Sequence, residues 1–168
     1  MIVQYEELSK LREMHKDKKI VFASGSFDLT HAGHILFFED CKKYGEILVV
    51  AIGEDSITRK FKGEVRPILN EYIRLKTVDS LKPVDYSLIV RETQLSPSYP
   101  LSISAFPNLF ERLKPDIWVV NKDALDISMR KELANKCNIK LIVSERYCPK
   151  EFEDISTTKL IEKIKKLQ

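Results

Sequence analysis

The sequence lacks any apolar run long enough to cross a lipid bilayer, and its longest continuous runs, such as residues 47–52, have the length of one strand. Its first residues are polar and contain no apolar core of the kind found in secretory signal peptides. These absences argue against a membrane-spanning or secreted protein. We therefore expect a cytoplasmic protein with no membrane span.

Cysteine is scarce, since the chain has only Cys41, Cys137 and Cys148, an odd number of residues that lie far apart. A disulfide framework or a structural zinc site needs cysteines in pairs, so neither is expected. Unpaired cysteines of this kind are typical of a reducing compartment. We predict no protein-bound metal site.

A surplus of charge of either sign is also absent, because 28 basic and 25 acidic side chains leave a net charge of +3. Dedicated nucleic-acid-binding domains usually carry a larger basic surplus, so no nucleic-acid partner is expected. The basic residues near the end of the sequence are interpreted as a solvated helix face. They are Lys159, Lys163, Lys165 and Lys166.

Short apolar runs alternate with longer segments of helical character along the 168 residues. The runs predict strands over 20–23, 47–52, 86–90, 116–120 and 140–144. Helices are predicted over about 5–16, 35–44, 70–81, 108–113, 128–137 and about 157–167, and 54–62 reads only as a charged segment. This alternation predicts one α/β domain over residues 1–168, a Rossmann-like, doubly wound parallel sheet that binds ligands beyond the carboxyl ends of its strands.

Residues 91–107 differ from the rest because they contain Pro97, Pro100 and Pro107 together with four serines. Regular structure is not expected there, and a loop of this length is usually functional or disordered. The segment follows a predicted strand, at the edge where a small molecule would bind.

One turn carries the strongest functional pattern, because residues 25–34 connect the apolar run 20–23 to the helix predicted over 35–44. A strand that ends in small residues and opens a helix is a common phosphate-binding arrangement, in which backbone N–H groups and the helix dipole face the anion. The candidate nucleotide-binding residues of this turn are Gly25, Ser26, Phe27, Asp28 and Gly33.

Two of the chain's three histidines, His31 and His34, lie three residues apart in this turn. At that spacing they share one side of the first helical turn, where imidazoles can donate hydrogen bonds to developing phosphate charge. The alternative interpretation is that Asp28 caps the helix and that both histidines are ordinary residues, either exposed or with their hydrogen bonds satisfied.

The turn resembles the H-x-G-H signature of the cytidylyltransferase-like nucleotidyltransferase superfamily, here His31-Ala32-Gly33-His34. Further landmarks of that family follow in the same order, namely Asp55-Ser56, Lys60, Lys62-Gly63, Arg66-Pro67-Ile68, Arg74, Val84-Asp85 and Ile155-Ser156-Thr157-Thr158-Lys159. The resemblance covers almost the whole chain. It implies a Rossmann-like enzyme that moves a nucleoside monophosphate from a nucleoside triphosphate to a small phosphorylated acceptor.

In such a reaction the acceptor phosphate attacks the α-phosphorus in line and pyrophosphate leaves, with Mg²⁺ bound to the triphosphate and no covalent enzyme intermediate. The resemblance implies that His31 and His34 stabilise charge on the α- and β-phosphates. Lys62 is the third candidate catalytic residue, and Lys60 would help to neutralise the phosphates. The alternative for both lysines is a solvated, charged segment.

Further nucleotide contacts follow from the same resemblance. Arg66 would bind a phosphate or the base, or serve as a structural ion-pair partner. Asp123 would contact the ribose, or be a plain loop aspartate. Ser156, Thr157 and Thr158 would offer hydroxyl and backbone N–H groups to the triphosphate at the start of the final helix, which would close the nucleotide site. Ser156 could equally be the N-cap of that helix.

The candidate acceptor-binding residues are Arg74, Arg91 and Tyr99. Arg74 could instead tie its helix to the site or lie on the surface. Arg91 and Tyr99 belong to the segment 91–107, which could shape the acceptor pocket or be a disordered surface loop.

Two branches of the family fit the sequence. Phe152-Glu153-Asp154, with the motifs above, resembles the adenylyltransferase domain that activates heptose 1-phosphate, so a sugar phosphate is the leading acceptor and ATP or CTP the donor. The motif 155–159 also resembles glycerol-3-phosphate cytidylyltransferases, although those carry an arginine where this chain has Glu151. The alternative is therefore a cytidylyltransferase for glycerol phosphate, another polyol phosphate, phosphoethanolamine or phosphocholine.

The sequence Asn121-Lys122-Asp123 stands where both branches usually have a glycine–aspartate step. This departure raises a further alternative, a catalytically inactive regulator that binds nucleotide. Against it, His31, His34 and Lys62 are all present. Members of the family commonly form homodimers, so the resemblance implies a homodimer.

Overall fold

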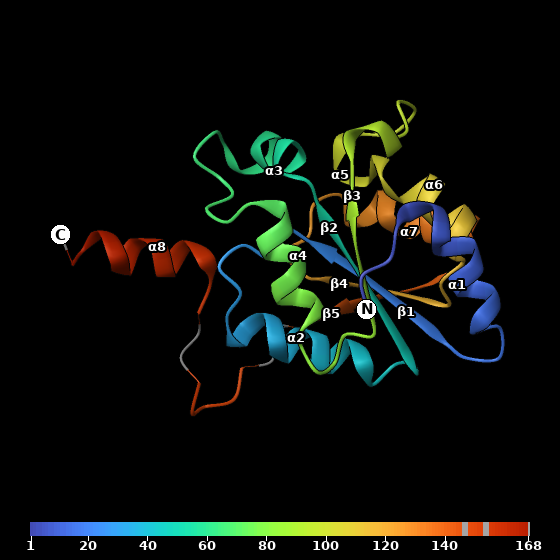
Figure 1. Cartoon of the computed structure of the whole chain (residues 1–168), viewed down its shortest axis with the longest axis horizontal. Coiled ribbons are helices and arrows are strands. Elements are labelled where there is room, and N and C mark those ends of the chain that lie inside the picture. The colour runs from blue at the N-terminus through green and yellow to red at the C-terminus, as the bar shows by residue number, and fades with distance from the viewer. Residues whose placement is uncertain (146–147, 153–154, 168) are drawn as a thin grey trace.

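A five-stranded parallel sheet lies between two layers of helices in the computed structural model, which describes residues 1–145, 148–152 and 155–167 (Figure 1). The strands are β1 (Ile20–Gly25), β2 (Ile47–Gly53), β3 (Tyr86–Val90), β4 (Ile117–Asn121) and β5 (Lys140–Ser144). All five predicted strands are confirmed, because continuous apolar runs are what a sheet covered on both faces requires. The Rossmann-like α/β class is confirmed with them.

The helices and short 3₁₀ turns alternate with the strands. They are η1 (Tyr5–Glu7), α1 (Leu8–Met14), α2 (Ala32–Lys42), α3 (Asp55–Lys62), α4 (Glu71–Asp79), η2 (Glu92–Gln94), α5 (Leu101–Ser104), α6 (Phe106–Leu113), α7 (Ile127–Lys136) and α8 (Thr157–Lys165). Across the described stretches, none of these helices has the length and apolar composition needed to cross a membrane.

The alternation of side chains along β1 divides the core into two clusters. Ile20 and Phe22 pack with α1, α6 and α7 on one face of the sheet, and Val21 and Ala23 pack with α2 and α4 on the other. The helices of the two clusters lie on opposite sides of the sheet in Figure 1. The sheet is therefore doubly wound.

The strand order is β3-β2-β1-β4-β5, so the chain changes direction across the sheet between β1 and β4. Val21 of β1 is opposite Ile117 of β4, while Ile20 is opposite Ile47 of β2. Ligands of open α/β sheets bind where the order reverses, beyond the carboxyl ends of the strands. The turn that follows β1 lies at that point.

The expectation of an irregular segment over 91–107 is wrong, because η2, α5 and the start of α6 lie within it. Ile103 is 1% exposed and Phe106 is 7% exposed, and both belong to the core cluster of α1 and α6. The prolines start helices here, since Pro100 precedes α5 and Pro107 stands in the first turn of α6. Residues 54–62, described from the sequence only as charged, form α3.

The last helix, α8, extends away from the rest of the domain in Figure 1, and none of its described residues is buried. Its apolar side includes Ile164, which is 54% exposed. Its start contacts the domain through Thr157, whose hydroxyl donates to the turn after β1. The proposed closure of a nucleotide site by this helix stays a prediction.

Replacement of Phe106 by alanine tests whether the segment 91–107 is part of the core. We expect Phe106→Ala to lower the free energy of unfolding by about 3–5 kcal/mol, because it removes a buried ring that packs on Phe22 and Trp118. Urea denaturation followed by circular dichroism measures this loss. Phe61→Ala, at a ring that is 40% exposed, is the matched control and should lose far less. Equal losses would show that the segment does not belong to the core.

Candidate active site

The turn after β1 has a tight backbone that was not predicted from the sequence. Phe27 and Leu29 have positive φ angles of 48° and 46°, in the left-handed region that costs a non-glycine residue about 1–2 kcal/mol. The turn is held by Thr30, whose hydroxyl donates to the Phe27 carbonyl at 3.0 Å. The buried Phe27 ring packs on Phe38 of α2, and a Cβ at Gly25 would lie 2.9 Å from that ring. Gly25 is therefore needed for packing of the turn.

The two histidines of the turn lie side by side at the start of α2. Their rings are stacked, with centroids 4.0 Å apart and planes inclined by 24°. The Nδ1 atom of His31 accepts a hydrogen bond from the Gly33 backbone N–H at 3.1 Å, so His31 is the N-cap of α2. The alternative that Asp28 caps this helix is wrong. Because Nδ1 is the acceptor, a neutral His31 carries its proton on Nε2, the nitrogen that can donate to an anion.

Asp28 instead holds a distant segment of the chain against the turn. Its carboxylate is completely buried and accepts hydrogen bonds from Arg66 Nε at 2.9 Å, Ile68 N at 2.9 Å and Leu69 N at 3.0 Å. Three donors compensate for the loss of water around the charge. The segment held in this way follows α3, the helix that carries Lys62.

Asp28 also contacts the start of α8. The Thr157 hydroxyl donates to the Asp28 carbonyl at 2.7 Å, across 129 residues of sequence. Next to it, the Ser156 hydroxyl accepts from Lys159 N at 3.2 Å and caps α8, as the capping alternative predicts, while Thr158 is exposed. Glu153 and Asp154, which carried part of the family resemblance, lie outside the described residues.

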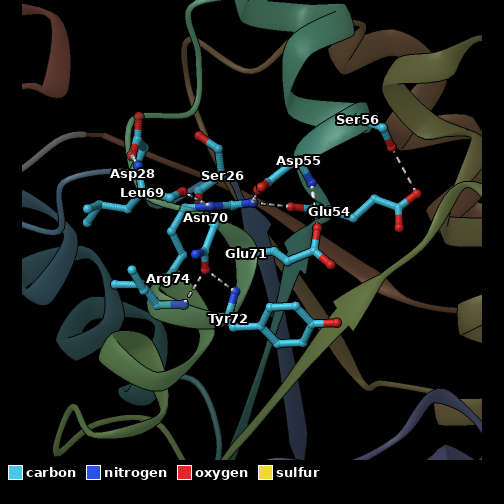
Figure 2. A network of polar contacts seen from close by, with 12 residues as sticks. Ser26, Asp28, Glu54, Asp55, Ser56, Leu69, Asn70, Glu71, Tyr72 and Arg74 are labelled. Atoms are coloured by element: carbon cyan, nitrogen blue, oxygen red, sulfur yellow. Dashed lines mark hydrogen bonds and ion pairs between the residues drawn. The ribbon is translucent and has the colours of Figure 1, made fainter.

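A buried arginine joins the turn to the neighbouring strand. Arg74 is 0% exposed, and its guanidinium donates to the carbonyls of Ser26, Gly53 and Leu69 and to Asp55 at distances from 2.6 to 3.0 Å (Figure 2). The turn after β1, the end of β2 and the start of α3 are therefore fixed to α4. This placement favours the tying role of Arg74 over direct contact with an acceptor.

The other candidate cations are closer to solvent. Lys60 pairs with Glu92 at 2.6 Å, whereas Lys62, in the last turn of α3, is exposed and forms no ion pair with any residue that the structure describes. Arg66, 12% exposed, is the ion-pair partner of Asp28, as one of its two interpretations predicts. Asp123 is exposed in the turn after β4.

Arg91 and Tyr99 do not project freely from a loop. Arg91 Nη1 lies 3.4 Å from Glu54 and 3.2 Å from Glu71, and hydrogen bonding to Tyr72 and Glu71 raises the pKa of its guanidinium. Tyr99 is half-buried against the core cluster of α6. Neither contact was predicted from the sequence.

A cavity of about 430 Å³ opens beside this group, between the starts of α3 and α4. Its lining residues are Glu54, Asp55, Ser56, Arg59, Asn70, Glu71 and Tyr72. Figure 2 shows that most of them belong to one polar network. Apart from Asp55 and Ser56, these residues were not predicted from the sequence, although Glu54 directly follows a strand and Asn70 directly precedes a helix.

The described residues contain no group of three or more histidine, cysteine, aspartate or glutamate side chains that could hold a metal ion by themselves. Mg²⁺ commonly binds through one or two carboxylates together with substrate phosphates and water.

The doubly wound sheet and the helix-opening histidine turn at its point of reversal define a Rossmann-like domain of the nucleotide-binding class. The profile of the cytidylyltransferase-like family matches residues 22–163. The chain belongs to this family. It is therefore of the nucleotidyltransferase class.

Relatives with curated names support this assignment. The chain is 38% identical over 161 residues to the bifunctional protein HldE of Campylobacter jejuni subsp. doylei and 36% identical over 160 residues to that of Helicobacter pylori strain P12. Each match covers 95% of this chain and 30% of the relative. The chain thus spans less than a third of the length of these relatives.

Solved structures share the fold. A lipopolysaccharide core biosynthesis protein from Thermoplasma volcanium is 29% identical with a TM-score of 0.61, covering 77% of this chain and 97% of that protein. The pantoate-beta-alanine ligase from Francisella tularensis has a TM-score of 0.66 at 17% identity, covering 98% of this chain and 77% of that protein, and shows likeness of fold alone.

Replacement of Asp28 by asparagine tests its role as a clamp. An amide has one acceptor oxygen where the carboxylate has two, and it leaves Arg66 without its counter-charge. We expect Asp28→Asn to lower the free energy of unfolding by about 2–4 kcal/mol. This is less than the loss expected when a fully buried ion pair is broken, because Arg66 is partly exposed. Chemical denaturation measures this change in the free energy of unfolding. Asp17→Asn, at an exposed aspartate, is the control. A variant as stable as the wild type would contradict the clamp.

Proposed function

We propose that this domain transfers a nucleoside monophosphate from a nucleoside triphosphate to a small phosphorylated acceptor and releases pyrophosphate. The observation that carries the proposal is the stacked pair His31 and His34 at the start of α2, beyond the carboxyl end of β1. A triphosphate in that position would meet two imidazoles and the positive end of a helix dipole.

The proposed roles follow from this placement. His34 and the Nε2–H of His31 donate hydrogen bonds to the α- and β-phosphates as charge develops during in-line attack. Lys62 reaches the phosphates from α3, because the segment that follows it is fixed to Asp28. Ser156, Thr157 and Thr158 offer donors from the start of α8, which the Thr157 contact holds against the same turn. None of these groups needs to form a covalent bond with the substrate.

Other assigned residues would act around the triphosphate. Gly25 and Gly33 let the backbone approach it, because glycine has no Cβ. Lys60 would have to exchange Glu92 for a phosphate, and Asp123 would contact the ribose. Arg91, with Glu54 and Glu71 beside the cavity, is the proposed acceptor-side cation.

The leading acceptor is a sugar phosphate, with heptose 1-phosphate first among the candidates and ATP first among the donors. The similarity to the bifunctional HldE proteins and to a lipopolysaccharide core biosynthesis protein supports this choice. Glu151 also supports it, because it stands where the glycerol-3-phosphate cytidylyltransferases have an arginine. Cytidylyl transfer to glycerol phosphate, another polyol phosphate, phosphoethanolamine or phosphocholine is the alternative.

The proposal includes Mg²⁺ bound with the triphosphate, where it would neutralise phosphate charge. It would be held by phosphate oxygens of the substrate together with one or two carboxylates, the usual arrangement for Mg²⁺ bound with phosphates. We also propose that the enzyme works in the cytoplasm and as a homodimer.

Pyrophosphate release measured with each of ATP, CTP, GTP and UTP against a panel of phosphorylated acceptors tests the reaction. We expect release that depends on both substrates, with ATP and heptose 1-phosphate as the leading pair. Glycerol 3-phosphate, ribitol 5-phosphate, phosphoethanolamine and phosphocholine complete the panel. Nucleotide binding without turnover on any acceptor would instead favour the regulator alternative.

A histidine variant tests the chemistry. We expect His34→Ala to lower kcat about 10²- to 10⁴-fold, while the dissociation constant of the nucleotide rises far less, because the lost hydrogen bond is strongest in the transition state. His15→Ala is the matched control, since His15 bonds to Tyr86 and lies outside the proposed site. Equal losses of kcat and of nucleotide affinity in His34→Ala would contradict this role.

A further inference from the structure

A second buried arginine lies on the other side of the point where the strand order reverses. Arg130, in the first half of α7, is 8% exposed, and its guanidinium lies over the rings of Phe106 and Trp118 at 5.1 and 5.2 Å. Its Nε donates to the Leu125 carbonyl at 2.7 Å, and its Nη2 donates to the Ser102 carbonyl at 2.8 Å. Arg130 therefore connects the loop before α7 to helix α5.

Burial lowers the pKa of Arg130 to about 10, so the side chain still carries its charge at neutral pH. A buried charge is costly, and an apolar side chain of similar size would fill the same space without that cost. The guanidinium adds directional hydrogen bonds that an apolar side chain lacks. Its two donors fix two carbonyl groups relative to each other. The carbonyls belong to segments that are 23 residues apart, at Ser102 and Leu125.

The loop that Arg130 holds, residues 121–126, runs from the last residue of β4 to the N-cap of α7. Its last residue, Asp126, has a positive φ of 56° and accepts a hydrogen bond from the Ser102 hydroxyl. The Asp126 carbonyl also accepts from Arg130 N at 2.9 Å. Helix α5 thus holds the loop through both a side chain and a backbone carbonyl.

This loop starts at the carboxyl end of β4, the strand next to β1 on the side where the strand order reverses. A ligand bound at that point lies between the turn after β1 and the loop after β4. The phosphate-binding turn is fixed by Asp28 and Arg74. The opposite wall, which includes Asp123, is fixed by Arg130 and Ser102.

We propose that Arg130 and Ser102 are positioning residues for nucleotide binding, because they hold the 121–126 loop against α5 in the shape that receives the nucleoside. The inference rests on the proposed function. It gives the segment 91–107, which packs in the core, a part in binding the donor nucleotide through its contacts with that loop.

Binding of ATP and CTP with Mg²⁺, measured by titration calorimetry, and the steady-state constants for the nucleotide test the proposal. We expect Ser102→Ala to raise the dissociation constant and KM of the preferred nucleotide about threefold to tenfold, as for one lost hydrogen bond. Its kcat should stay within about twofold of wild type. Ser102→Thr, which keeps the hydroxyl, should restore binding, and the exposed Ser98→Ala is the matched control.

Arg130→Lys, which replaces two donors fixed in one plane by a single ammonium group, should weaken binding more than Ser102→Ala does. Wild-type affinity in Ser102→Ala would overturn the proposal, as would a loss of thermal stability without a change in nucleotide affinity, because Ser102 would then serve packing alone. A wild-type protein that binds neither ATP nor CTP would overturn the proposed function itself, so the two failures are distinguishable.

Discussion

The buried carboxylate of Asp28 is the contact on which the candidate site depends. It has no access to water, so its charge is stable only while Arg66 and two backbone N–H groups donate to it. Those donors belong to the segment after α3, and the Asp28 carbonyl receives Thr157 from the start of α8. A single residue thereby brings together three parts of the chain that would bind a triphosphate jointly.

Two buried guanidinium groups extend this arrangement to the rest of the sheet edge. Arg74 fixes the turn after β1 to the end of β2, and Arg130 fixes the loop after β4 to α5. Loops at the edge of a sheet expose backbone carbonyls, and an arginine with several donors in a fixed plane can bond to carbonyls of two loops at once. The site is consequently ordered by cations that need not touch a substrate.

Local patterns in the sequence predicted the strands and the histidine pair, because an apolar run and a three-residue spacing are properties of neighbouring residues. The helix α5 was not predicted, because Pro100 and the serines around it are typical of loops. The burial of Ile103 depends on the surrounding core and is not apparent from the neighbouring residues. The pairing of Asp28 with Arg66 and the burial of Arg74 join residues 38 and 48 positions apart in sequence. Contacts at such separations depend on the fold. The family motifs therefore pointed to Asp28, Arg66 and Arg74, but their partners could be identified only from the structure.

The proposed site requires that one triphosphate contacts the turn after β1, Lys62 and the start of α8 together. A crystal structure with Mg²⁺ and a non-hydrolysable analogue of the preferred nucleoside triphosphate tests it most directly. We expect the α-phosphorus beside His34, with Lys62 and Thr157 in contact with the phosphates and the nucleoside toward the loop after β4. A nucleotide bound elsewhere, for example in the cavity lined by Glu54 and Tyr72, would contradict it.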